Sequence, residues 1–179
     1  MHDFIEEVLL TNEEIVAIAE KMGKQISVDY AGKKPLLIGL LKGSIPFMAE
    51  LMKHIDIDME IDFMRASSYS GVNSTGTVTI TKDTNTPLVG RDIIIVEDIV
   101  DTGLTIHEIK NLLKERKANS VKIATLLDKP SGRTVPNLKP DYVGKTIPGK
   151  FVVGFGLDYD ELYRNLPYVG VLKRSVYEK

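Results

Sequence analysis

The chain has 179 residues, enough for one domain with its own hydrophobic core, and we expect residues 1–179 to form that single domain. It contains no cysteine, which excludes thiolate nucleophiles, cysteine-ligated metals and a disulfide-stapled secreted fold. With 23 basic and 25 acidic residues the formal charge is −2, so we expect no nucleic-acid partner. The acidic N-terminus and the lack of an apolar run near ~20 residues predict no secretory signal, no membrane partner and a cytoplasmic location.

The apolar pattern predicts helices and strands that alternate along the chain. Thr11 and Glu14 fit a capping box at the start of an amphipathic helix that runs toward Gly32. A strand over 36–41 follows, and then a helix opened by Pro46. Further strands are expected at 57–63, where apolar and acidic residues alternate, and around 78–80, 92–96, 121–127, 142–147, 151–155 and 169–172, with a helix that carries Ile106, Ile109, Leu112 and Leu113.

This alternation favours an α/β fold, in which helices flank both faces of a mostly parallel sheet. Ligands of such sheets bind beyond the carboxyl ends of the strands. Four segments directly follow predicted strands and should gather at that edge: LLKGS, VEDIVDTGLT, LLDKP and FGLDYD. We interpret residues 128–149 as a connection into a small lobe, and expect the Ser- and Gly-rich segment 67–76 to be mobile.

The strongest functional signal is IIIVEDIVDTGLT, residues 93–105. A β-branched run places Glu97 and Asp98 at a strand end, and Asp101 opens a Thr- and Gly-rich turn into a helix. Such a turn offers backbone N–H groups to an anion. Acidic groups beside an anion call for a hydroxylated sugar or a divalent cation, and Mg²⁺ held partly by substrate phosphates suits that requirement. A solvated acidic turn with Asp101 as a helix cap remains the alternative.

VEDIVDTGLT resembles the 5-phosphoribosyl-1-pyrophosphate motif of the type I phosphoribosyltransferases. LLDKP and KFVVGFGLDYDELYRNLPYVGVL are similar to the 6-oxopurine branch of that family, and the resemblance extends from about Leu36 to Leu172. It implies the type I phosphoribosyltransferase fold, with a small purine-binding hood built from the N- and C-terminal segments, in a homodimer or homotetramer. It also implies Mg²⁺-dependent transfer of phosphoribosyl from 5-phosphoribosyl-1-pyrophosphate to N9 of hypoxanthine or guanine, giving IMP or GMP and pyrophosphate in purine salvage.

The resemblance assigns roles within the acidic motif. Glu97 and Asp98 would bind the ribose hydroxyls directly or through Mg²⁺, and Asp101 would be the general base near N7 of the purine. A carboxylate there is useful because the base loses its N7 proton as the new bond forms. The 5′-phosphate would be cradled by Thr102, Gly103, Leu104 and Thr105.

Two lysines receive roles in the same way. Lys42 and Gly43 resemble the pyrophosphate loop, which in the family contains a non-proline cis peptide next to the lysine; an ordinary strand–helix turn is the alternative. Lys129 matches the lysine that donates to the 6-oxo group. Because lysine is only a donor, it should disfavour adenine, whose 6-amino group is also a donor.

The remaining site residues lie near the C-terminus and after the predicted strand at 57–63. Phe151 would stack on the base and Val152 would read its edge through the backbone, although Phe151 alone is typical of a core residue. Asp158 would be a further Mg²⁺ ligand with Glu97 and Asp98, and Arg164 would reach the pyrophosphate; surface ion pairing is their alternative. Ser68 and Tyr69 match the start of a lid, or of a plain surface loop.

Two other functions fit parts of the pattern. A non-catalytic sensor of phosphoribosyl pyrophosphate or nucleotides could share this fold, but it would need a nucleic-acid-binding surface or domain. A phosphoacceptor receiver domain fails because Val8, Leu9 and Leu10, in the first strand, offer no acidic pair. The relative preference among hypoxanthine, guanine and xanthine stays open.

Overall fold

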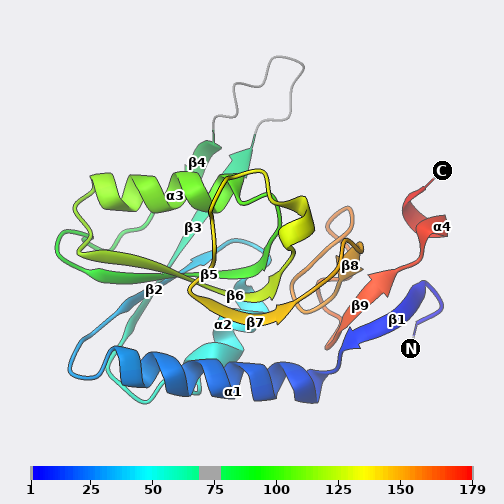
Figure 1. The fold of residues 1–179 in the computed structure, drawn as a ribbon, viewed down its shortest axis with the longest axis horizontal. Helices are drawn as coiled ribbons and strands as arrows, with labels where there is room; N and C mark the ends of the chain where they lie inside the picture. The colour runs from blue at the N-terminus through cyan, green and yellow to red at the C-terminus, as the bar shows by residue number, and fades with distance from the viewer. Residues whose placement is uncertain (1, 69–77, 179) are drawn as a thin grey trace.

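The computed structural model describes residues 2–68 and 78–178. Within them, a six-stranded sheet has the order β4-β3-β2-β5-β6-β7 (Figure 1). Every neighbouring pair is parallel except β3 and β4, which confirms the predicted α/β fold. The strands of this main sheet are β2 (Leu36–Leu40), β3 (Glu60–Ser68), β4 (Val78–Lys82), β5 (Asp92–Val100), β6 (Ser120–Asp128) and β7 (Tyr142–Thr146).

Helices cover both faces of the main sheet. Helices α1 (Asn12–Asp29) and α2 (Ile45–Met52) pack on one face, and α3 (Leu104–Glu115) packs on the other (Figure 1). The predicted capping box starts α1: Thr11 Oγ1 accepts from the Glu14 amide at 3.2 Å, and Glu14 Oε2 accepts from the Thr11 amide at 2.8 Å. No helix in the described part of the chain is long and apolar enough to cross a membrane.

The two ends of the chain meet in a second, antiparallel sheet with the order β1-β9-β8. It comprises β1 (Ile5–Leu10), β8 (Val152–Val153) and β9 (Val169–Leu172), followed by a short helix α4 (Arg174–Tyr177). Ile5, Val153, Leu166 and Leu172 form its buried apolar cluster. We call this unit the hood; it lies beside the main sheet, with both termini at its outer end (Figure 1).

Several boundaries differ from the sequence prediction. The region 128–149 is more than a connection into a lobe, since after the 3-10 turn η1 (Pro130–Gly132) it contributes β7 to the main sheet. The strand expected at 151–155 is only Val152–Val153, because Gly154 and Phe155 adopt positive φ angles and turn the chain away. FGLDYD therefore follows a hood strand and not a strand of the main sheet, so the expected single edge is built by two sheets.

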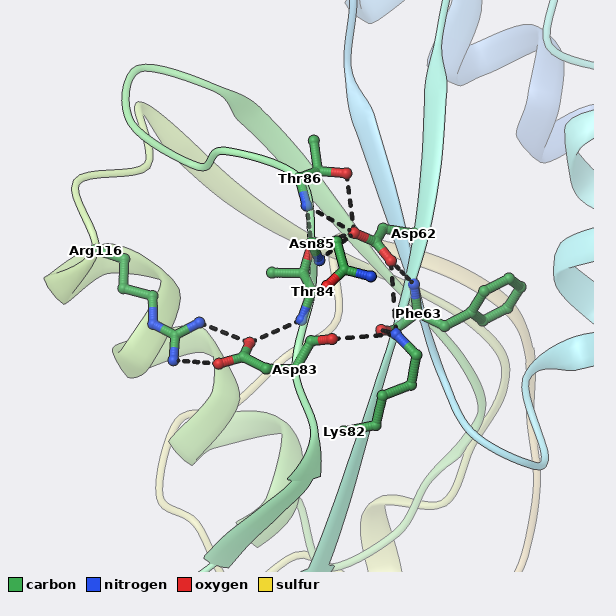
Figure 2. A network of polar contacts seen from close by, with 8 residues as sticks. All are labelled: Asp62, Phe63, Lys82, Asp83, Thr84, Asn85, Thr86 and Arg116. Carbon is green, nitrogen blue, oxygen red and sulfur yellow. Dashed lines mark hydrogen bonds and ion pairs between the residues drawn. The ribbon is translucent and has the colours of Figure 1, made fainter.

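The alternating segment 57–63 also differs from the predicted strand with one solvent-exposed face. The strand begins only at Glu60, and its faces are not simply apolar and wet: Ile61 is exposed, whereas the Asp62 side chain is only 13% exposed. Asp62 is buried because the segment 84–86, which connects β4 to β5, donates hydrogen bonds to it (Figure 2). A polar side chain saturated in this way can take an inward position that the alternation alone assigns to an apolar one.

Candidate active site

The acidic motif forms one wall of a cleft at the carboxyl edge of the main sheet. Strand β5 carries Glu97 and Asp98, and the turn after it leads through Gly103, whose φ is +83°, into α3. A cavity of about 240 Å³ opens here and is lined by residues of β5 and the following turn, among them Glu97, Asp98, Asp101, Thr102, Gly103 and Thr105. Leu104 begins α3, and its amide points back to Thr102 Oγ1 at 3.4 Å.

Glu97 and Asp98 are neighbouring buried acids that are costly to ionise together. Burial and the neighbouring Asp98 carboxylate raise the pKa of Glu97 well above its usual value. Burial also raises the pKa of Asp98 to about 6, although the Ile99 amide and the Arg164 charge act in the opposite direction. A bound cation, or hydroxyl groups that donate hydrogen bonds, would relieve the cost of ionising both acids.

A second cavity, of about 230 Å³, adjoins the first and shares Asp98, Ile99 and Asp101 with it. Its other walls come from β6 and the hood: Lys129, Lys150, Phe151, Val152, Leu157 and Asp158. The two cavities are therefore the two ends of one cleft between the main sheet and the hood. This arrangement brings together residues that the sequence placed in four separate segments.

Asp101 and Lys129 face each other inside this cleft. Lys129 Nζ lies 2.5 Å from Asp101 Oδ2, and the lysine side chain is only 18% exposed. The two residues follow β5 and β6, which are neighbouring parallel strands with Val100 opposite Asp128. The parallel register is what delivers an acid and a base, 28 positions apart in the chain, to the same point.

The loop after β2 approaches the acidic strand at van der Waals distance. The Leu41–Lys42 peptide is cis, as the resemblance implied. A Cβ atom on Gly43 would lie 1.8 Å from Asp98 Oδ2, so any side chain at this position would displace the carboxylate or the loop. Glycine is required here because the backbone and an acidic side chain share one space.

Charged residues of the hood pair with each other and with Lys42. Arg164 Nη2 lies 2.9 Å from Asp158 Oδ1, and Arg164 Nη1 donates to Gly156 O at 2.7 Å. Lys42 Nζ lies 2.7 Å from Glu161 Oε2. Asp158 and Arg164 thus form the ion pair that the alternative reading expected, but they form it at the cleft. Glu161 was missed by the sequence reasoning, which gave no role to acids flanking Asp158.

Four predicted positions remain: Phe151, Val152, Ser68 and Tyr69. Phe151 is 39% exposed, so the alternative of a core residue is wrong; its ring stacks on Tyr177 with centroids 4.9 Å apart and meets Tyr159 edge-on. Val152 is buried in β8 and lines the second cavity. Ser68 is the last residue of β3, and Tyr69 lies outside the described residues.

The cleft offers oxygen ligands, but few of them. In residues 2–68 and 78–178, no three His, Asp or Glu side chains are grouped so that they could hold a metal ion by themselves. Glu97 and Asp98 remain side by side, whereas Asp158 is paired with Arg164. Mg²⁺ is usually held by one or two carboxylates together with substrate oxygens, so this donor set fits a cation that arrives with a phosphorylated ligand.

The chain is similar to known proteins over nearly all of its length. A family model described as the phosphoribosyl transferase domain matches residues 7–160. Hypoxanthine-guanine phosphoribosyltransferases of Streptococcus pyogenes and Streptococcus mutans are 58% and 57% identical over 176 residues, which is 98% of this chain and 97% of theirs. The crystal structure of a hypoxanthine phosphoribosyltransferase from Staphylococcus aureus is similar with a TM-score of 0.96 at 51% identity, covering 100% of this chain and 97% of that one.

The chain therefore belongs to the phosphoribosyltransferase family, and the fold expected from the resemblance is confirmed. Both curated relatives carry the name hypoxanthine-guanine phosphoribosyltransferase, which confirms the prediction of an enzyme of the transferase class. The alternative of a non-catalytic sensor is set aside.

Proposed function

We propose that this protein transfers the phosphoribosyl group of 5-phosphoribosyl-1-pyrophosphate to N9 of hypoxanthine or guanine, giving IMP or GMP and pyrophosphate. One observation carries the proposal: the Asp101–Lys129 pair lies in the same cleft as the Thr- and Gly-rich turn that opens α3, whose backbone N–H groups suit a phosphate. The cleft can therefore hold one ligand that has a purine edge at one end and a sugar phosphate at the other.

The purine end is argued from hydrogen-bond polarity. N7 and O6 are neighbours on one edge of a 6-oxopurine. With N7 protonated, that edge presents a donor next to an acceptor, which matches Asp101 beside Lys129 at 2.5 Å. Adenine would turn its amino group toward the lysine, so donor would face donor. The exposed ring of Phe151 lines the same cavity and offers a stacking surface for the base.

The phosphate end is argued from the helix terminus. Thr102, Gly103 and Thr105 line the first cavity at the start of α3, a helix of 12 residues. Helix N-termini bind anions through their backbone N–H groups and the positive end of the helix dipole. We assign the 5′-phosphate to this turn, and the pyrophosphate to the side where Lys42 and Arg164 lie, each now paired with an acidic side chain that the ligand would replace.

The proposed chemistry needs one proton acceptor. The bond from C1′ to the pyrophosphate oxygen breaks, the bond from C1′ to N9 forms, and the N7 proton passes to the Asp101 carboxylate. General-base assistance of this type is worth about 10²- to 10⁴-fold. Mg²⁺, bound by Glu97 and Asp98 together with ligand oxygens, would neutralise charge on the departing pyrophosphate. Glu97 and Asp98 would position the ribose whether they bind its hydroxyl groups directly or through Mg²⁺.

Initial rates with phosphoribosyl pyrophosphate and Mg²⁺, measured in parallel on hypoxanthine, guanine, xanthine and adenine, test the proposal. We expect turnover of hypoxanthine and guanine and little turnover of adenine. The rate with xanthine measures how the cleft treats position 2 of the ring. No turnover with any base would refute the proposed function.

Replacing the proposed specificity lysine tests the purine end separately. Lys129→Ala removes a charged hydrogen bond, so kcat/KM for hypoxanthine should fall by about 10- to 100-fold and the margin over adenine should shrink. Lys24→Ala is the matched control, because Lys24 is exposed on α1 and pairs with Glu20 on the same helix. Equal base selectivity in Lys129→Ala and the unmodified protein would remove this role.

A further inference from the structure

We propose that Arg133, which the sequence did not single out, is a positioning residue of this enzyme: it fixes the turn after β5 so that Asp101 and the phosphate-binding backbone keep their places. The inference rests on the proposed function, because it assigns the device that orients the proposed general base. Arg133 itself touches neither proposed substrate position.

The Arg133 guanidinium binds the backbone at three places. Nε donates to Asp101 O at 2.9 Å, Nη2 donates to Val100 O at 3.2 Å, and Nη1 donates to Leu138 O at 2.5 Å. The side chain is only 12% exposed. This buried cation ties the carbonyls of Val100 and Asp101, at the turn after β5, to the Leu138 carbonyl of a separate segment. Breaking these charged hydrogen bonds would cost free energy, so the turn is restrained.

The guanidinium is oriented by an acid at the end of β6. Arg133 Nη2 also contacts Asp128 Oδ1, and the Asp128 side chain is likewise 12% exposed. The planar fork of an arginine can serve this carboxylate and the carbonyls at the same time, whereas a lysine ammonium would act from a single point. Asp128 thus anchors the guanidinium to the sheet, and the guanidinium anchors the turn.

The residues after Arg133 bind the next carbonyl of the turn, that of Thr102. The amides of Thr134 and Val135 both donate to Thr102 O, at 3.0 Å and 3.3 Å. In a trans peptide the carbonyl and the following N–H point in opposite directions, and the peptides of this turn are trans. Because the carbonyls of Asp101 and Thr102 point toward this segment, the next two amides, those of Thr102 and Gly103, point away from it.

The same short segment carries the proposed purine-binding lysine. Lys129 donates its amide to Val100 O at 3.0 Å, and its Nζ contacts Asp101. The aliphatic stem of Arg133 lies over Gly103, where a Cβ atom would come within 3.1 Å of Arg133 Cδ. Residues 129–135 therefore contact both the base end and the phosphate end of the cleft, and Arg133 supplies two side-chain bonds to the turn, to Val100 O and Asp101 O.

The test compares two conservative variants, Arg133→Lys and Arg116→Lys. Arg133→Lys keeps a positive charge beside Asp128 but cannot bond all three carbonyls, so we expect kcat to fall about 10- to 100-fold and KM for phosphoribosyl pyrophosphate to rise several-fold. Arg116 also makes a two-bond ion pair, with Asp83 at 2.7 Å, but far from the cleft, so Arg116→Lys should keep the kinetic constants of the unmodified protein.

Melting temperature and GMP affinity are measured on the same samples. A positioning role predicts a loss of kcat in the folded variant at saturating substrate. Unchanged kcat and KM in folded Arg133→Lys would overturn the inference. If that variant does not fold, Asp128→Asn, which leaves the guanidinium–carbonyl bonds possible but removes their anchor, should lower kcat several-fold; kcat equal to that of the unmodified protein would overturn it equally. Absence of turnover in the unmodified protein would instead contradict the proposed function.

Discussion

At the residue scale, the acids of the cleft differ in what stands beside them. Glu97 and Asp98 have each other, and burial keeps the pKa of both raised. Asp101 has Lys129 at 2.5 Å, and Asp158 has Arg164 at 2.9 Å. The first two are suited to a cation or to sugar hydroxyls, the third to a proton beside an oxo group. Identical side-chain chemistry is thus divided into different tasks by its neighbours.

Asp101→Asn tests the proposed general base. The amide keeps the shape of the side chain but cannot accept the N7 proton, so kcat should fall by about 10²- to 10⁴-fold with little change in KM for either substrate. Steady-state kinetics over both substrates give this separation, with Asp56→Asn, at an exposed position, as the control. Turnover that survives in Asp101→Asn would assign the proton to another acceptor.

Gly43→Ala tests the close approach between the loop after β2 and Asp98 of β5. The new Cβ would lie 1.8 Å from Asp98 Oδ2, so either the loop or the carboxylate must move. We expect kcat/KM for phosphoribosyl pyrophosphate to fall at least about 10-fold, because small displacements at a reacting centre are costly. Circular dichroism should show a folded protein. Full activity would mean that the loop moves aside without cost.

At the scale of elements, hydrogen bonds to Asp62 join β3 of the main sheet to the connection from β4 to β5. Asp62 Oδ2 accepts from the amides of Asn85 and Thr86 at 2.9 Å and 3.0 Å, and from Thr86 Oγ1 at 2.9 Å (Figure 2). Arg116 ties the same connection to the C-cap of α3 through Asp83 (Figure 2). These bonds fix the connection between β4 and β5.

The hydrogen bonds to the Asp62 carboxylate predict a defined pH dependence of the free energy of unfolding. Burial alone would raise the pKa of Asp62, but hydrogen bonds from Thr84, Phe63 and Thr86 hold it below the usual range. A lowered folded-state pKa stabilises the fold above the unfolded value of about 3.9 and loses that contribution as pH falls toward the folded value. Asp62→Asn should therefore lower the free energy of unfolding by about 2–3 kcal/mol near pH 7.

Urea unfolding of Asp62→Asn and the unmodified protein at several pH values measures this difference. It should be constant from pH 5 to 7 and should shrink below about pH 4, where the unfolded carboxylate takes up protons. Asp58→Asn, at an exposed position before β3, is the control. A difference that persists undiminished into strong acid would show that the carboxylate charge is not what stabilises the connection.

At the scale of the whole molecule, the two sheets meet at the cleft and share an apolar cluster that includes Val152, Val169 and Val171 of the hood. A ligand that touches Asp101 on one side and Phe151 on the other joins them. Binding to the folded state alone stabilises it by about 2.7 kcal/mol at a ligand concentration of 100 Kd. For a chain of this size, that corresponds to an increase in Tm of roughly 5–10 °C.

Thermal unfolding with and without GMP measures this linkage. The increase in Tm should depend on GMP concentration and should be smaller with free guanine, which reaches only the purine end. AMP is the matched control, because it keeps the phosphate but turns an amino group toward Lys129. Equal stabilisation by GMP and AMP would contradict the proposed purine recognition.

The sequence by itself determined what depends on local periodicity and turn chemistry. The capping box at Thr11 and Glu14 starts α1, and the strand predicted at 169–172 is β9. The parallel α/β class followed from the alternation of strand and helix patterns along the chain, and each of these patterns depends only on neighbouring residues. The family resemblance added the site positions, and the structure places most of them in one cleft; their roles stay predictions until the kinetics above are measured.

Only the tertiary structure decided which distant residues touch. The burial of Asp62 depends on a connection more than 20 positions away. The main-sheet order puts β5 between β2 and β6, and this places Gly43, Asp98 and Lys129 around one space. Arg133 gained its role from three carbonyls that no motif encodes. Periodic patterns fix how each segment folds, but the order and register of strands fix which side chains share a site, and those are properties of the assembled sheet.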